Sequence, residues 1–319
     1  SDWQVTCNNQ NFCVARNTGE HHGLVMTLSR SAGAHTDAVL RIELGGLESP
    51  TAKESDIAPR LLLDGAPLPL RGEHWRITPW QLMTDDPATI RAFLTTVQDA
   101  KAITLQKGAQ NLSLVGLKAA LLFIDAQQKR VGSETAWIEK GDEPPLSVPP
   151  APALKGVAVI NPTPTPLTQQ ERSELLDYGN WRINGIRCSI DPLRREMRVT
   201  PLTDDKALLM IGCEAGAYNT IDLAWVVSRT TPLTSRAVRL SLPFKTDAES
   251  RDMELTNATF DEKSRELVTL AKGRVLADCG IETRWLYDGH SFRLVRYAQE
   301  PSCDNWHGPD AWPTLWITR

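Results

Sequence analysis

Residues 2–15 read DWQVTCNNQNFCVA, and this stretch decides how the chain begins to fold. Apolar and polar residues alternate from Asp2 to Cys7, which is typical of a half-buried β-strand. The asparagine-rich residues 8–11 favour a turn, and an apolar stretch returns after it. Because Cys7 and Cys13 flank this turn, we expect a β-hairpin that is held by a disulfide.

The following sequence predicts a β-rich first domain, residues 1–143, that also contains two helices. Asp86 before Pro87 is a good helix N-cap, because proline is favoured at the first helical position. Ser113 is expected to cap the second helix, which ends near Gly132. Alternation and turn residues predict strands at 24–28 and 38–44 and a hairpin within 61–70.

A proline-rich linker is expected at residues 144–166, which hold eight of the 21 prolines. Proline fixes its own backbone and drives its predecessor towards extended conformations, so this segment should be neither helix nor inner strand. It separates the first domain from a second one, residues 167–319.

The second domain is predicted to be an antiparallel β domain. A capping box formed by Thr168 and Glu171 indicates a short helix at its start, and Asp288-Gly289 between aromatic residues indicates a hairpin. Strands are expected at 198–201, 208–212, 221–227, 237–243, 253–260, 266–271, 283–287, 292–297 and 316–318. The predicted fold class is α+β, mostly β, with two antiparallel, sandwich-like domains.

Composition and charge exclude several classes of partner. The net charge of −4 and the pI near 5.9 give no global attraction to nucleic acid or to an anionic membrane surface. No apolar run approaches the roughly 20 residues that span a bilayer. The chain starts at Ser1 with strand-like sequence, as expected after removal of a signal peptide or a tag.

Six cysteines form three couples that are local in sequence, and none belongs to a CxxC motif. The entropic cost of closing a loop grows with its length, so we expect each cysteine to bond within its couple. Disulfides persist in oxidising compartments, which predicts a periplasmic or secreted protein. The expected pairs are Cys7 with Cys13, Cys188 with Cys213, and Cys279 with Cys303.

The segments DWQVTCNNQNFCVA, GRVLADCG (273–280) and RWLYDGHSFRLV (284–295), with the tryptophan-rich end (303–316), resemble domain of unknown function 1176. That family consists of exported Gram-negative proteins with six shared cysteines, so the resemblance implies an envelope location and no established reaction. The opening hairpin and LSLVGLKAAL (112–121) also make the first domain similar to the invasion-associated locus B proteins.

No catalytic residue and no metal ligand set is predicted. His21 and His22 would point to opposite faces of a strand, and a solvated loop explains them better than a metal site. The acidic pair 85–86 fits a helix cap and the pair 204–205 a turn, and the acidic segment 247–252 lacks the glycine of a calcium loop.

Aromatic residues at the end of the chain are the candidate binding residues. Exposed aromatic rings stack on sugars or anchor protein partners, with arginine providing polar contacts. Packing of the same rings in a core around a disulfide is the alternative, and the sequence leaves both open. The candidates are Trp285, Tyr287, Arg293, Trp306, Trp312 and Trp316.

These observations predict a non-enzymatic binding module for an envelope protein or a glycan, without a cofactor. Two alternatives stay open: a cell-envelope hydrolase whose carboxylates are brought together by the fold, and a secreted inhibitor of an enzyme.

Overall fold

The computed structural model describes residues 2–19, 23–35, 37–45, 55–107, 110–246 and 250–319. The predicted histidine pair at 21–22 and the acidic residue 247 lie outside these ranges. The chain forms two compact units, one of Ser1–Leu154 with Gln299–Ile317 and one of Lys155–Ala298 with Thr318–Arg319. The fold is mostly β with antiparallel sheets, which confirms the predicted class.

The first unit is built on an antiparallel sheet with the strand order β1-β2-β3-β4-β8-β7. A smaller sheet has the order β10-β9-β5-β6. The bounds are β1 Trp3–Cys7, β2 Cys13–Asn17, β3 Leu24–Arg30, β4 Ala38–Leu44, β5 Leu61–Leu63, β6 Ala66–Pro67, β7 Arg76–Ile77, β8 Gln81–Thr84, β9 Ala102–Leu105 and β10 Asn111–Ser113.

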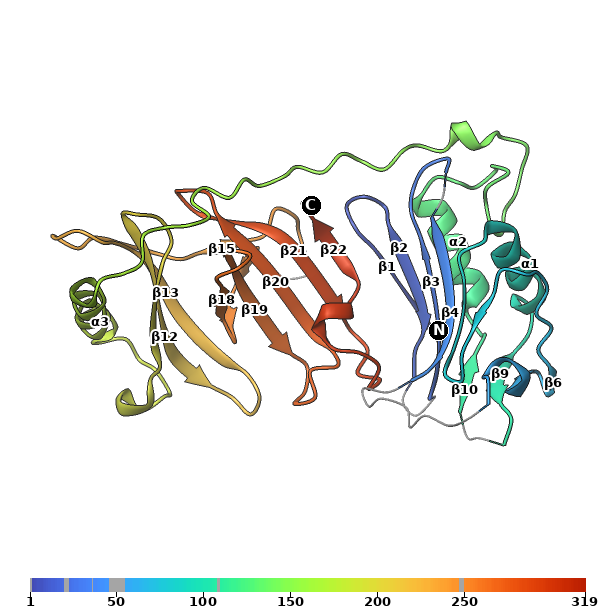
Figure 1. Ribbon diagram of the computed structural model, residues 1–319, viewed down its shortest axis with the longest axis horizontal. Coiled ribbons are helices and arrows are strands. Elements are labelled where there is room, and N and C mark those ends of the chain that lie inside the picture. Colours follow the sequence, from blue (N-terminus) through green and yellow to red (C-terminus); the bar gives the residue numbers. More distant parts are fainter. Residues whose placement is uncertain (1, 20–22, 36, 46–54, 108–109, 247–249) are drawn as a thin grey trace. The chain divides into compact units, whose positions relative to one another are not determined.

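Helices α1 (Pro87–Val97) and α2 (Leu117–Gln127) cover one face of the first sheet, as Figure 1 shows. The alternate residues of each strand that face them are apolar, and with the apolar helix faces they form one buried core. Leu28 and Leu40 of the sheet and Leu94 and Leu121 of the helices belong to this core. The opposite face of the sheet is therefore free to carry polar side chains.

Local capping signals placed α1 correctly and misplaced the start of α2. The Asp86 carboxylate accepts a hydrogen bond from the backbone N–H of Thr89, as predicted. Ser113 does not cap α2, because its hydroxyl donates to Asp2 Oδ2 and the helix instead starts after Gly116. Gly116 has a φ of 97°, a conformation that glycine adopts without steric cost.

The second unit starts with α3 (Gln169–Ile183), whose predicted capping box between Thr168 and Glu171 is present. Leu175 and Ile183 of α3 pack on a sheet with the order β11-β12-β13-β14, and β17 also pairs with β13. The bounds are β11 Met197–Pro201, β12 Lys206–Ala215, β13 Thr220–Ser228, β14 Ser235–Ala237 and β17 Leu255–Thr256.

A further sheet of the second unit contains strands in the order β18-β19-β20-β21, and β15 pairs with β16. The hairpin predicted at Asp288-Gly289 joins β20 to β21. The last residues of β21 belong to the first unit, as does β22 (Thr314–Ile317). The other bounds are β15 Leu240–Ser241, β16 Asp252–Met253, β18 Thr259–Asp261, β19 Glu266–Lys272, β20 Gly280–Tyr287 and β21 Phe292–Glu300.

The single strand predicted at residues 253–260 was wrong, because the structure divides this segment into parts of β16, β17 and β18. Asn257 has a φ of 46°, which ends the extended conformation. Its side chain stabilises this bend by accepting from the Thr220 backbone N–H and donating to the Leu270 carbonyl oxygen.

All six cysteines lie in the described part of the chain and all are disulfide-bonded. The bonds between Cys7 and Cys13 and between Cys188 and Cys213 follow the expected local pairing. Cys279 and Cys303 are disulfide-bonded as well.

Candidate functional site

The outer face of the first sheet carries a row of polar side chains across four strands. The strand register places Gln4 opposite Arg16, Arg16 opposite Thr27, and Thr27 opposite Arg41. Because side chains alternate between faces, these residues all project away from the helices and the apolar core. The sheet therefore presents hydrogen-bond donors and acceptors on this face.

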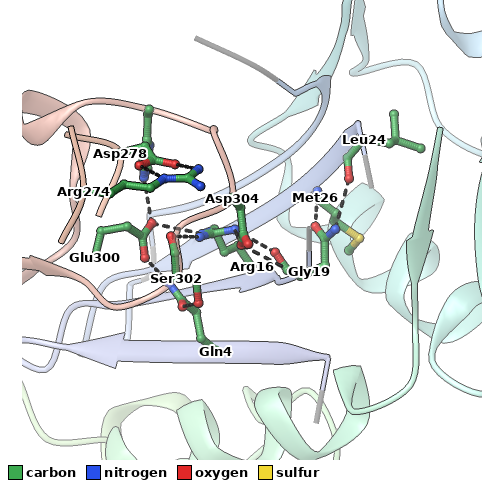
Figure 2. Close-up of polar contacts among 12 residues, drawn as sticks. Gln4, Arg16, Gly19, Leu24, Met26, Arg274, Asp278, Glu300, Ser302 and Asp304 are labelled. Carbon is green, nitrogen blue, oxygen red and sulfur yellow. Dashed lines mark hydrogen bonds and ion pairs between the residues drawn. The ribbon is translucent and has the colours of Figure 1, made fainter. Parts of the chain in front are cut away.

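Arg16 anchors the C-terminal segment of the first unit to this face, as Figure 2 shows. Its Nε lies 3.1 Å from Glu300 Oε1, and its Nη1 lies 2.9 Å from Asp304 Oδ2. The Arg16, Glu300 and Asp304 side chains are at most 5% exposed, so both ion pairs are sheltered from water. Such pairs hold the segment firmly, because losing one partner would leave a buried charge uncompensated.

Gln4 and His307 complete the contacts around the Glu300 carboxylate. Gln4 Nε2 donates to Glu300 Oε2 at 2.6 Å, and His307 Nε2 lies 2.9 Å from Oε1. Ser302 donates its hydroxyl hydrogen to Gln4 Oε1 at 2.7 Å. Glu300 thus connects β1, β2 and the loop that carries His307.

The asparagine-rich turn after β1 fixes the other end of the segment. Asn8 Nδ2 donates to Thr314 Oγ1 at 3.0 Å. The Asn9 amide forms two bonds with Ile317, from its Nδ2 to the carbonyl oxygen and from the Ile317 N–H to its Oδ1, both 2.9 Å. These contacts explain why residues 299–317 group with the first unit, although the sequence analysis assigned them to the second domain.

A pocket of about 540 Å³ lies between the polar face and this segment, all of it formed by the first unit. Its volume is within the range of small-molecule sites. The sheet contributes polar groups to it, and the segment contributes the half-buried Trp306 and His307. The residues that line it are Gln4, Phe12, Val14, Arg16, Thr27, Ser29, Arg41, Glu43, Gln81, Glu300, Trp306, His307, Ala311 and Pro313.

Two carboxyl groups of this pocket have pKa values that are displaced in opposite directions. Burial raises the pKa of Glu43 above its usual value, against the lowering effects of Arg41 and His307. Burial also acts to raise the pKa of Glu300, but the hydrogen bond from His307 and the charge of Arg16 lower it overall. Glu300 is thus held as a carboxylate, while Glu43 takes up a proton more readily than an exposed glutamate.

The predicted aromatic candidates do not form one surface. Trp285 is fully buried and donates its Nε1 hydrogen to Thr283 Oγ1, and Tyr287 and Trp312 are buried as well. In the second unit Arg293 is exposed and forms an ion pair with Asp288.

Trp306 is the predicted candidate that lines the pocket, while Trp316 is half-buried in β22. Sequence reasoning missed the polar residues of the pocket, including His307. The alternation Gln4-Val5-Thr6 in the first strand was a usable signal, because it predicts a polar outer face. It does not show which segment covers that face.

Two acidic residues of the second unit, Asp204 and Asp222, have structural roles. Asp204 accepts hydrogen bonds from the backbone N–H and the hydroxyl of Thr165, and these bonds lower its pKa. Asp222 is buried and forms an ion pair with Arg198 at 2.7 Å. Neither belongs to the pocket.

Comparisons with known proteins give matches that cover the whole chain. A family model described as "Protein of unknown function (DUF1176)" matches residues 1–319. The chain is 78% identical over 319 residues to "Uncharacterized protein YpfG" of Escherichia coli (strain K12), covering 100% of this chain and 92% of that protein. No solved structure matches the chain. The likeness to invasion-associated locus B proteins is not shown by these comparisons.

Proposed function

This chain belongs to the DUF1176 family of proteins of unknown function, and from its pocket we propose that it is a non-enzymatic envelope protein that binds a glycan. The observation that carries the proposal is that one pocket combines a tryptophan, Trp306, with amide, hydroxyl and charged groups of the first sheet. Sugars offer an apolar ring face for stacking and a rim of hydroxyl groups for hydrogen bonds, which matches this combination.

Export from the cytoplasm is compatible with the three disulfides. Within the described residues, no helix combines the length and apolar character needed to cross a bilayer. The proposal places the protein in the periplasm of a Gram-negative bacterium after removal of a signal peptide, where glycans of the cell wall are available.

The test is calorimetric titration of the oxidised protein with soluble cell-wall glycan fragments and with a panel of other oligosaccharides. Trp306→Ala should weaken binding at least about fivefold, because stacking of an aromatic ring supplies about 1 kcal/mol or more. Trp181→Ala is the matched control, since Trp181 is 65% exposed in the second unit and does not line the pocket. Equal losses in both variants, or binding to none of the glycans, would refute the proposal.

A hydrolase is the second candidate function, and the opposite pKa displacements of Glu43 and Glu300 favour it. A carboxyl group with a raised pKa and an ionised carboxylate in one pocket are the combination that glycoside hydrolysis uses. The contacts of Glu300 with Gln4, Arg16 and His307 favour a structural role for it instead. Release of reducing ends from a bound glycan, abolished by Glu43→Gln with binding retained, would establish the hydrolase.

A further inference from the structure

A second pocket of the first unit, about 270 Å³ in volume, lies beside the start of α1 and the end of β3. Arg30 and Arg91 line it together with Thr135, and Ile90 and Trp137 contribute apolar surface. The exposed Glu134 is also at its rim. None of these residues belongs to the pocket proposed to bind a glycan.

Three guanidinium groups converge on the loop that forms one wall of this pocket. Arg30 Nη2 donates to the Thr135 carbonyl oxygen at 2.7 Å, and Arg130 Nη1 donates to the Thr135 hydroxyl at 3.0 Å. Arg91 donates to the carbonyl oxygens of Ala136 and Glu134 at 3.1 and 3.3 Å. These neutral acceptors hold the arginines in place but do not neutralise their charge.

Asp125 is the carboxylate available to balance this charge. Its Oδ1 lies 3.5 Å from Arg30 Nη1, and within the described residues neither Arg91 nor Arg130 forms an ion pair. Asp125 is fully buried, and its oxygens also accept the backbone N–H groups of Trp137 and Ile138. Three guanidinium groups therefore face one buried carboxylate in a region where charge is poorly solvated, whereas the Glu134 side chain at the rim is exposed.

Arg30, which lines this pocket, has hydrogen-bonding capacity that the described residues leave unused. Its side chain is 4% exposed, and its Nε and Nη1 lack a hydrogen-bond acceptor within the described part of the chain. Its guanidinium lies over the Trp137 ring, 4.1 Å from the ring centre, which fixes its orientation. Burial, with the charges of Arg130 and Arg91, lowers the pKa of Arg30 to about 9, so the group remains a cation at neutral pH.

We propose that this pocket binds an oxyanion, a phosphate or carboxylate group, which pairs with Arg30 and Arg91 and completes the charge balance. Guanidinium groups recognise both anions through charge-assisted hydrogen bonds. The wall formed by Trp137 and Ile90 would accept an apolar part of a larger ligand that carries the anion. This site is independent of the proposed glycan pocket.

The test is thermal unfolding of the full chain with increasing sodium phosphate or sodium acetate, each at an ionic strength held constant with sodium chloride. A ligand that binds the folded state should raise the midpoint by about 3 °C or more for each tenfold increase above its dissociation constant. The two salts distinguish phosphate from carboxylate recognition. Equilibrium dialysis with labelled phosphate or acetate should give one bound anion per chain.

Arg91→Gln should reduce the midpoint shift at least fivefold, because it removes one of the two cations that pair with the anion. Arg91 is partly exposed, so its replacement leaves the core intact. Arg71→Gln, an exposed arginine of the same unit that lines neither pocket, is the matched control and should keep the full shift. The proposal is overturned if neither anion binds, if chloride produces the same shift, or if Arg91→Gln and Arg71→Gln respond alike.

Discussion

Two buried arginines on adjacent strands of the first sheet differ in how their charge is balanced. Arg16 on β2 and Arg30 on β3 have side chains that are equally exposed, at 4%. Arg16 projects from the outer face and pairs with two carboxylates, Glu300 and Asp304. Arg30 projects from the inner face and shares a single carboxylate, Asp125, with its cationic neighbours.

This difference separates a structural ion pair from a ligand-binding candidate. A buried cation with a full set of partners contributes to holding its segments together and gains little from an added anion. A buried cation with an incomplete set would gain a partner from solution. The charge balance of each group therefore predicts how the protein responds when the arginine is removed.

The largest effect is expected for Arg16→Met, which leaves Glu300 and Asp304 buried without their cation. Breaking a buried pair on one side costs about 3–5 kcal/mol in the free energy of unfolding. Urea unfolding monitored by circular dichroism measures it. The double variant Arg16→Met with Glu300→Gln should recover part of the loss, and a cost below about 1 kcal/mol would contradict the role of Arg16 as an anchor.

A smaller effect is expected for Arg30→Met, about 1–2 kcal/mol. The Thr135 carbonyl oxygen loses its donor, which costs stability, while the repulsion between Arg30 and Arg130 is relieved. Asp125 keeps its two backbone N–H partners and the nearby charge of Arg130, so its carboxylate stays compensated. If the same unfolding measurement gave a loss as large as that of Arg16→Met, the charge around Arg30 would have to be balanced already.

The pH dependence of stability provides a third test, this time of the Arg16 anchor. The pKa of Glu300 is lowered in the folded state, so its contribution is complete above the ordinary glutamate value, about 4.3, and disappears as the pH falls through the lowered value. Between about pH 5 and about pH 3, the free energy of unfolding of the Glu300→Gln variant should fall less steeply than that of the unmodified chain. Parallel slopes would show that Glu300 does not titrate with folding.

Local features of this fold could be predicted from sequence because their partners are close in the chain. The Cys7–Cys13 hairpin, the Asp86 cap and the Thr168–Glu171 capping box each join residues within one turn or hairpin. The Arg16 anchor could not, since 284 residues separate it from Glu300. No periodic pattern shows which strand face a distant segment will cover.

Residue type also failed to distinguish core from surface among the tryptophans. Trp285 and Trp306 both lie in the aromatic C-terminal region, but the first is fully buried and the second lines the pocket. Strand alternation separates faces only when the sheet has one solvent-exposed side. To predict that Trp285 is buried, with its Nε1 bonded to Thr283, one must know what packs on its sheet.

The smallest effect is expected for Glu43→Gln, which changes the pocket and leaves the ion pairs of Arg16 beside it intact. The raised pKa of Glu43 means that the folded state favours its protonated form, so the ionised form destabilises the fold above the raised value. Glutamine removes this cost, and the variant should be about 0.5 kcal/mol more stable than the unmodified chain at neutral pH. The difference should vanish as the pH falls to about 3, well below the ordinary glutamate pKa of about 4.3, where the unmodified Glu43 is protonated in both states. Glu73→Gln, at an exposed position of the same unit, is the control and should show no such gain.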